Sequence, residues 1–305
     1  MTKNIRTFVV KSLDLAINCH YLTSGLISST FLSRTAPTYV LLLFLYLNSF
    51  SVLAQNGCTI SNHAFSEGEE LRFKVVYNWG PIWLESAEAR FNVNSGNYSG
   101  KKCYVFTGKG NTYPRYDWFF KVNDEFETYV DTLTFRPLKF RADIYEGSKQ
   151  DKHLYLFNNA HHKVYTIINY GAQPVKVDTL SVNPCSIDVL TAIYFARNLD
   201  YSQCRVNDTI GISIVLDGKL VPLYVRYLGK EVFTSEELGT YRCIKFRPLL
   251  VEGTIFKKGE HMNVWVTDDL NKVPLYIETS IIVGSVKVSL TGYKGLRNPQ
   301  VSKLK

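Results

Sequence analysis

The sequence lacks the short motifs that mark the common catalytic centres. It holds no GxSxG, no HExxH and no phosphate-cradling glycine loop, which removes the usual signatures of serine hydrolases, zinc peptidases and nucleotide-binding enzymes. It also holds no CxxC pair, so neither a zinc knuckle nor a thioredoxin-like motif is predicted. No cofactor and no metal site is therefore expected, and an enzymatic role is not favoured.

Runs of basic residues are missing as well. The formal net charge is +8, but four of the basic residues and only one acidic residue lie in the first 54 positions. Elsewhere Lys and Arg alternate singly with apolar residues, which is typical of the solvated face of a strand. Nucleic acid is therefore not an expected partner.

Methionine is scarce, with 2 residues, whereas Tyr (20) and Phe (18) are abundant, a balance that favours β structure. Cysteine is also infrequent. Without Cys19, which lies in the amino-terminal segment, five cysteines remain, and an odd number leaves at least one thiol free. Their pairing stays open; they are Cys58, Cys103, Cys185, Cys204 and Cys243.

The amino-terminal segment has the layout of a secretory signal. Residues 39–47 are an apolar run, and Val52-Leu53-Ala54 is a small-residue cleavage site. We expect residues 1–54 to be a signal sequence with a long n-region, followed by one β-rich domain over residues 55–305. A signal anchor is the alternative, but the apolar run is short for a span of roughly 20 residues. The expected location is the periplasm or the outer membrane, with membrane contact only through an uncleaved signal or surface association.

Cys58 follows the predicted signal closely, which raises the question of lipid attachment. The residues before it, Gln55-Asn56-Gly57, do not have the small-residue approach that a lipoprotein signal requires, so lipidation is not expected.

Most of the remaining chain alternates apolar and polar residues with a period of two. The segment LRFKVVYNW places Leu71, Phe73, Val75, Tyr77 and Trp79 on one face. Similar segments follow at short spacing, separated by Gly, Asn and Asp, which predicts antiparallel β meanders.

One segment breaks the alternation and predicts a helix over residues 187–198. Ser186 is the expected cap, Asp188 lies in the first turn, and Arg197 lies in the last turn with the favourable sign. Apolar residues cover most of the circumference, so this helix is expected to be buried on several sides. These residues are Val189, Leu190, Ile193, Tyr194 and Phe195.

Two segments of the chain are similar to each other. Residues 130–148 match residues 266–285 when Asp131 is aligned with Asp268, and Pro137 then falls on Pro274. This predicts two related meanders, at about residues 65–180 and 206–295, with the helix between them. They are expected to form a sandwich or a half-open barrel. A chance match is the alternative, because turn chemistry repeatedly selects Asp, Pro and Gly.

Several phrases, taken in order, resemble exported Bacteroidetes members of the domain-of-unknown-function family 3108. The resemblance covers about residues 58–299 and implies a β-rich secreted or envelope protein of a Gram-negative bacterium, with no established activity to carry over. The phrases are GEELRFKVVYNW, SAEARF, WFFKVND, CSIDVLTAIYFARNLD, YRCIKF, VWVTDDLNKVPL and GSVKVSLTGYKGLRNP.

The polar residues give only weak candidates for a catalytic or metal site. His161 and His162 are adjacent, so on a strand they point to opposite faces, and a polar hairpin turn is the preferred interpretation. Four acids cluster in sequence, but they alternate with aromatics like the wet face of a strand. They are Asp124, Glu125, Glu127 and Asp131.

Aromatic loops give the stronger signal. Tryptophan, tyrosine and arginine are the residues that contact carbohydrate, lipid and protein hot spots, although they equally fill the end of a barrel. The candidate binding residues are Trp79, Trp83, Tyr113, Arg115, Tyr116 and Trp118. We expect a non-catalytic envelope scaffold whose partner is a lipid, a glycan or an envelope protein. The alternative is a hydrolase acting on envelope polysaccharide, with Asp124 and Asp131 among its acids.

Overall fold

The structure is a computed structural model that describes residues 59–79, 81–116, 118, 120–250, 259–281 and 284–305. Residues Gln55–Lys305 form one compact unit. The predicted signal segment, its cleavage site, Cys19 and Cys58 lie outside the described residues.

The described residues are mainly β, with one α-helix. The strands are β1 (Glu70–Trp79), β2 (Ile82–Tyr98), β3 (Lys101–Thr112), β4 (Asn123–Asp131), β5 (Pro137–Glu146), β6 (Lys149–Asn158), β7 (Lys163–Tyr170), β8 (Lys176–Ser181), β9 (Ser186–Ile187), β10 (Thr209–Leu216), β11 (Lys219–Ser235), β12 (Gly239–Pro248), β13 (Met262–Thr267), β14 (Pro274–Ser280) and β15 (Ser285–Lys294). The helices are the short 3-10 helix η1 (Pro114–Tyr116) and the α-helix α2 (Val189–Asn198).

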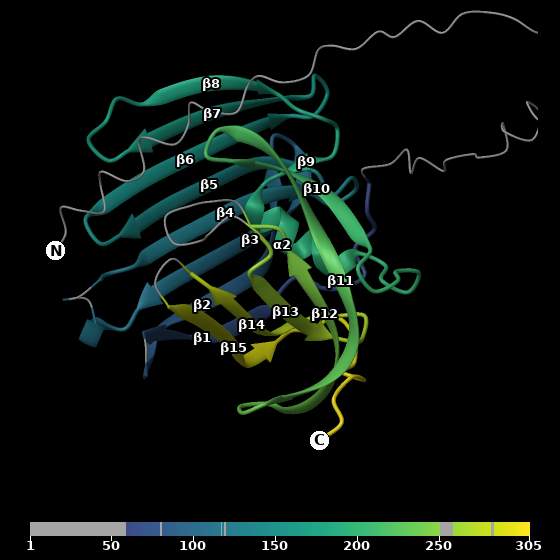
Figure 1. The fold of residues 1–305 in the computed structure, drawn as a ribbon. Helices are drawn as coiled ribbons and strands as arrows, with labels where there is room; N and C mark the ends of the chain where they lie inside the picture. The colour runs from purple at the N-terminus through teal and green to yellow at the C-terminus, as the bar shows by residue number, and fades with distance from the viewer. Residues whose placement is uncertain (1–58, 80, 117, 119, 251–258, 282–283) are drawn as a thin grey trace, which may run out of the picture. The chain divides into compact units, whose positions relative to one another are not determined.

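All fifteen strands belong to one sheet. Strands β1 to β8 pair consecutively in one direction and β10 to β15 in the other, and β1 joins the two runs by pairing with β15. The sheet curls around α2, and its two edges are β8 and β9 (Figure 1). The prediction of antiparallel meanders around a buried helix is confirmed, and of the two expected arrangements the structure shows the half-open barrel.

Antiparallel pairing places successive turns at opposite ends of the strands. The β1–β2, β3–β4, β5–β6, β10–β11 and β14–β15 connections lie at one end, which we call the loop end. The β4–β5 and β13–β14 connections lie at the other end, which we call the plugged end, because α2 and both terminal segments pack there.

Helix α2 lies between strands β3 and β4 on one side and β10 on the other (Figure 1). Its N-cap is Asp188, not the expected Ser186, and the Asp188 carboxylate accepts hydrogen bonds from the Thr191 backbone N–H at 2.8 Å and from the Thr128 hydroxyl at 2.9 Å. The prediction of burial on several sides is wrong at Ile193, which is 39% exposed. The helix buries one stripe because the sheet curls around it incompletely; the stripe consists of Leu190, Thr191, Tyr194 and Arg197.

A buried ion pair ties this helix to the start of β1. Arg197 donates to both carboxylate oxygens of Glu69, at 2.5 and 2.8 Å, and the two side chains are 2% and 0% exposed. The same guanidinium donates to the carbonyls of Asn271 and Ala64, at 3.0 and 3.4 Å. Four acceptors from two segments, the one before β1 and the β13–β14 connection, therefore meet on one cation at the plugged end.

The β10–β11 turn connects the two runs of strands, β1–β8 and β9–β15, across the inside of the curled sheet. The Gly218 N–H donates to the Tyr155 hydroxyl of β6 at 3.4 Å. Gly218 has φ +67, and a Cβ there would lie 2.9 Å from the Ile168 side chain of β7, so the contact favours glycine. Because the edge strands β8 and β9 do not pair with each other, the two runs of strands meet through this turn instead.

The two similar sequence segments have the same backbone irregularity. The β4–β5 pairing skips Leu138 between Pro137 and Lys139, and the β13–β14 pairing skips Leu275 between Pro274 and Tyr276. The β13–β14 loop is one residue longer than the β4–β5 loop. As a result, the N–H that donates to β12 belongs to Asp268, whereas the N–H that donates to β3 belongs to Thr132, the residue after Asp131. That the two halves are related copies stays a prediction.

Candidate functional site

The predicted aromatic residues gather at the loop end. Trp83, at the start of β2, is 50% exposed, and the Lys287 ammonium of β15 lies 4.1 Å from the centre of its ring. Trp118, in the β3–β4 loop, is 84% exposed. Trp79 is the last residue of β1. The loop end therefore presents indole rings to the surroundings.

Arg115 organises the first part of the β3–β4 loop. Its guanidinium lies 5.2 Å from the Tyr113 ring and 5.0 Å from the Tyr116 ring, and it donates to the Glu85 carbonyl at 3.2 Å. The Tyr113 hydroxyl donates to the Glu85 carboxylate at 3.0 Å. Burial together with this carboxylate raises the pKa of Tyr113, so the phenol keeps its proton.

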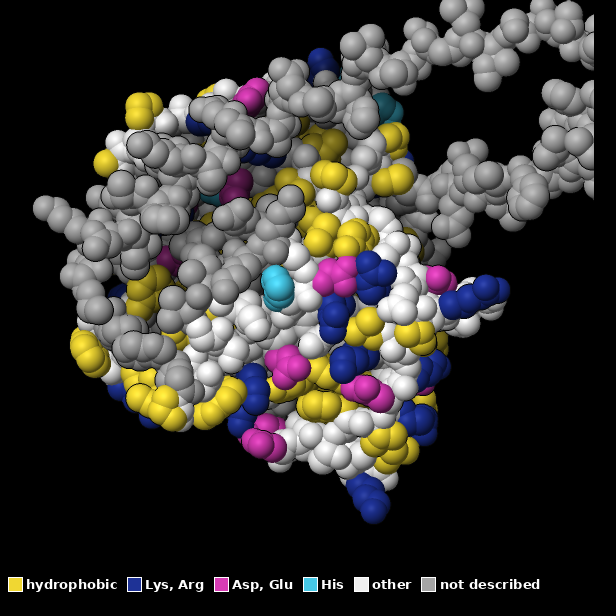
Figure 2. Space-filling model, viewed as in Figure 1, with side chains coloured by type: hydrophobic (Ala, Val, Ile, Leu, Met, Phe, Trp, Pro, Cys, Tyr) yellow, Lys and Arg dark blue, Asp and Glu magenta, His cyan; other side chains and the backbone are white. Residues whose placement is uncertain are grey.

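Two apolar residues that sequence reasoning missed extend this surface. Ile82 is 50% exposed at the β1–β2 turn, and Phe120 is 43% exposed beside Gly147 of the β5–β6 turn. Figure 2 shows hydrophobic side chains at the lower left edge of the view, where Figure 1 places η1 and the end of β1. We call the four exposed apolar side chains the aromatic surface; they are Ile82, Trp83, Trp118 and Phe120.

A polar cluster lies next to this surface, on the inner face of β6. Asp151 and His153 are 3% and 5% exposed, although Tyr155 and Phe157 on the same face belong to the apolar core. The Lys149 ammonium lies 2.7 Å from Oδ2 of Asp151. Within the part of the chain that the structure describes, Oδ1 of Asp151 and Nε2 of His153 have no hydrogen-bond partner.

The histidine of this cluster is neutral. Burial lowers the pKa of His153, against the nearby carboxylates of Asp217 and Asp151, which raise it. Burial raises the pKa of Tyr155, and its hydroxyl lies 3.1 Å from Nδ1 of His153, so the phenol donates there while it accepts from Gly218. This assignment leaves Nε2–H as a buried donor.

Two further acids lie on the same face nearer the loop end. Burial raises the pKa of Asp124, on β4, to about 6, although a hydrogen bond from the Tyr145 N–H at 2.9 Å acts against this. Burial also raises the pKa of Glu146, on β5. Perturbed acids gathered in one place are typical of functional sites. The signal in the sequence was the segment KQDKHLYLF, in which Asp151 and His153 share a face with apolar residues.

The structure separates the acids that the sequence placed together. Asp124 and Asp131 stand seven positions apart along β4, which puts them about 23 Å apart and excludes them as a glycosidase pair. Glu125 pairs with Lys109 on the outer face, as expected for a wet strand face. Asp131 caps the β4–β5 turn by accepting two backbone N–H groups, and His161 lies in the β6–β7 turn, as predicted.

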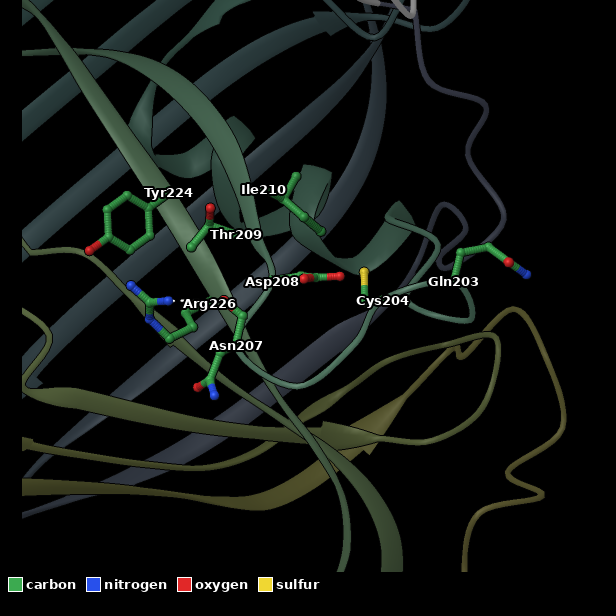
Figure 3. A pocket seen from close by; sticks show the side chains of 8 residues that line it. All are labelled: Gln203, Cys204, Asn207, Asp208, Thr209, Ile210, Tyr224 and Arg226. Carbon is green, nitrogen blue, oxygen red and sulfur yellow. Dashed lines mark hydrogen bonds between the residues drawn. The ribbon is translucent and has the colours of Figure 1, made fainter. Parts of the chain in front are cut away.

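A shallow depression lies between the segment before β10 and the strands β10 and β11 (Figure 3). The Arg226 guanidinium in this depression donates to the Asn207 carbonyl at 2.9 Å. Two of its nitrogens, Nε and Nη2, donate to the Glu260 carboxylate. This ion pair lowers the pKa of Glu260 to about 2. Arg226 and Glu260 are therefore engaged with each other, and the Asp208 carboxylate accepts the Arg205 N–H at 2.8 Å. The lining residues are Gln203, Cys204, Asn207, Asp208, Thr209, Ile210, Tyr224 and Arg226.

The cysteines divide into two kinds. Cys185 is disulfide-bonded, whereas Cys103, Cys204 and Cys243 are free. Burial raises the pKa of the Cys243 thiol to about 12, so it packs as an apolar side chain. Among the described residues, no group of three His, Cys, Asp or Glu side chains could hold a metal ion, and no helix has the length and apolarity to cross a bilayer.

Comparison with known proteins places the chain in a family. A similar solved structure is the crystal structure of a β-barrel-like protein of the domain of unknown function DUF1849 from Brucella abortus. It has a TM-score of 0.49 and 8% sequence identity, and the match covers 77% of this chain and 99% of that chain. No curated protein matches the chain. The model of the family described as "Protein of unknown function (DUF3108)" matches residues 72–291, and the chain therefore belongs to this family.

Proposed function

We propose that this chain is a non-catalytic β scaffold of the cell envelope, which binds an amphipathic ligand or a partner protein through the aromatic surface. One observation carries the proposal. Four large apolar side chains, three of them aromatic, are 43–84% exposed at one end of the sheet, whereas the exposed apolar side chains at the opposite end, such as Leu133 and Leu270, are aliphatic. Exposed apolar side chains that gather in one place mark binding sites on proteins of this size.

Export is part of the same proposal. It is supported by the signal-like sequence of residues 37–55 and by the disulfide at Cys185, because disulfides persist in oxidising compartments. Fractionation of cells that produce the full chain, followed by mass spectrometry of its amino terminus, tests this part. A chain recovered in the cytoplasm with its first residues intact contradicts it.

The binding proposal is tested by native mass spectrometry of the gently purified protein. We expect a bound lipid, glycan or partner that is lost in the Trp83→Ala/Trp118→Ala double variant. The control replaces two exposed leucines at the plugged end, Leu133 and Leu270, which are 85% and 60% exposed. A protein that carries no ligand, or one that keeps its ligand after loss of both tryptophans, contradicts the proposal.

A hydrolase acting on envelope polysaccharide is the second candidate. The observation that favours it is the raised pKa of both Asp124 and Glu146, because a general acid must hold its proton near neutral pH. The assay is release of reducing ends from cell-wall polysaccharide. Activity lost in both Asp124→Asn and Glu146→Gln supports this function, and no release by the unmodified protein excludes it for that substrate.

A further inference from the structure

Strand β8 leaves one edge of the sheet open. Among the described strands it pairs only with β7, whereas β9, at the other end of the sheet, has two residues (Figure 1). The Val182 N–H donates to the His162 carbonyl at 2.9 Å in the register of this ladder, so the even-numbered residues of β8 face β7. The N–H and C=O groups of Val177 and Thr179 therefore face the open edge, where a further strand can pair with them.

The side chains of β8 alternate between the two faces of the sheet. Lys176 lies opposite the buried Ile168 of β7, so Lys176 and Asp178 are on the inner face. Val177 is on the outer face and is 70% exposed, and Val175, two positions before it, is 54% exposed. The edge therefore combines exposed apolar side chains with one cation and one anion that share a face.

Neither charge of β8 forms an ion pair with the rest of the described chain. The Asp178 carboxylate accepts the N–H of Thr179 at 2.7 Å, which covers one of the groups that face the open edge. The β10–β11 turn, which lies over β7, contributes one acid and one base, and β7 contributes one base on the outer face. The charged residues of these neighbouring elements are Asp217, Lys219 and Lys163.

A second copy of β8 is complementary to this edge in one register. A two-fold axis perpendicular to the sheet pairs the strands antiparallel, and residues opposite each other then share a face. With Val177 at the axis, Lys176 of each copy lies opposite Asp178 of the other, at the closer type of cross-strand pair. An axis at Lys176 or at Asp178 brings like charges together, and an axis at Thr179 places Asp178 opposite Leu180. The alternation of charge along β8 therefore selects both the register and a partner that carries the same alternation.

We propose that two copies of this chain associate by antiparallel pairing of β8 with β8, centred on Val177. Residues 175–179 exchange backbone hydrogen bonds across the axis, and the two Val177 side chains cover each other on the outer face. Each Asp178 carboxylate leaves the Thr179 N–H for the Lys176 ammonium of the other copy, and that N–H donates to the Val175 carbonyl across the axis. No residue of the aromatic surface takes part, so this inference does not depend on the proposed function.

Sedimentation of the full chain over a range of concentrations measures the association. We expect a reversible dimer, and we expect Lys176→Asp and Asp178→Lys each to raise its dissociation constant at least about tenfold, because each creates two like-charge pairs across the axis. An equimolar mixture of these two variants should form a heterodimer. The double variant Lys176→Asp/Asp178→Lys should dimerise again, since its charges are exchanged but still opposite.

The matched control is Lys152→Asp, which makes the same change of charge at an exposed position of β6 and should associate as the unmodified protein does. All variants keep residues 1–54, so any association through the apolar run at residues 39–47 is common to them.

Cross-linking tests the register. In a Cys204→Ser background, Val177→Cys should form an intermolecular disulfide under mild oxidation, because the two Cα atoms of a hydrogen-bonded pair lie about 5.5 Å apart. Thr179→Cys should not, because the axis places its two copies four positions apart along the strands.

Three results overturn the inference. They are a protein that sediments as a monomer at every concentration, a dimer that the charge variants leave unchanged, and a cross-link through Thr179→Cys without one through Val177→Cys. A strand of a different protein on β8 would appear as the first of these results.

Discussion

The buried pair of Glu69 and Arg197 makes a quantitative prediction about the plugged end. Replacing Arg197 with Met leaves a carboxylate that is 1% exposed without its two strongest donors. An uncompensated buried charge costs about 3–5 kcal/mol. The carbonyl of Asn271 also loses a donor, for a further net cost of about 1 kcal/mol. We therefore expect Arg197→Met to lower the free energy of unfolding by about 4–6 kcal/mol.

Substitution of the partner residue, Glu69, and of both residues together separates the effect of charge from the effect of packing. Glu69→Met leaves the guanidinium unpaired and should cost about 3–5 kcal/mol. The double variant buries two apolar side chains of similar volume, so it should be more stable than the sum of the single losses predicts, by at least about 2 kcal/mol.

Urea unfolding of the full chain, followed by circular dichroism, measures these differences. The control is Lys230→Met, which breaks the pair of Lys230 and Asp268, where the lysine side chain is 56% exposed. That change should cost less than about 1 kcal/mol, because an exposed pair is screened by water. A loss below about 1.5 kcal/mol in Arg197→Met, or a double variant that is strictly additive, refutes the reasoning.

Three further predictions concern titration, thiols and backbone shape. Because the folded pKa of Asp124 is raised from 3.8 to about 6, its ionisation removes stability as pH rises through that window. Asp124→Asn should therefore raise the free energy of unfolding at neutral pH by about 1–3 kcal/mol, and this gain should disappear near pH 4. An equal gain at both pH values contradicts this. Native-state labelling with a maleimide, read by peptide mass, should modify Cys204 but not Cys103 or Cys243, which are both fully buried. Gly284→Ala should lower the unfolding midpoint, because φ is +88 and the added Cβ would lie 2.0 Å from a β1 carbonyl; an unchanged midpoint contradicts this.

Local sequence pattern was sufficient to predict the strands and the helix, but not how far the sheet curls around the helix. The period-two alternation predicted the strands, and the apolar segment predicted a helix whose observed bounds, Val189–Asn198, differ by two residues at the start. The cap was misplaced because both Ser186 and Asp188 can accept a backbone N–H, and the Thr128 hydroxyl, which is distant in sequence, selects Asp188. Which face of the helix is buried depends on how far the sheet curls, so the exposure of Ile193 could not be read locally.

The candidate sites show the same division. The exposure of Trp83 and Trp118 agrees with the prediction that the aromatic loops lie at the surface, and their role in binding remains a proposal. The polar cluster was missed because the acids considered were those close in sequence. Asp217 approaches His153 only after the β10–β11 turn folds across β6, and no spacing in the sequence encodes that contact.

Both ends of the sheet bury polar groups, but among the described residues the ion pair with both side chains buried lies at the plugged end. At the plugged end, the Arg197 guanidinium donates to the Glu69 carboxylate and to the carbonyls of Ala64 and Asn271. These bonds join helix α2 to the segment before β1 and to the β13–β14 connection. At the loop end, Asp151 and His153 are nearly as buried, yet each leaves one polar atom without a partner among the described residues. Such an atom costs about 1–3 kcal/mol when neither water nor a ligand reaches it. The same end carries the raised pKa values of Asp124 and Glu146 and the exposed tryptophans. Buried polar atoms without a partner among the described residues also lie at the plugged end, on Arg136, Tyr241 and Gln300, so what distinguishes the two ends is the paired charge of Arg197 at one and the exposed tryptophans at the other.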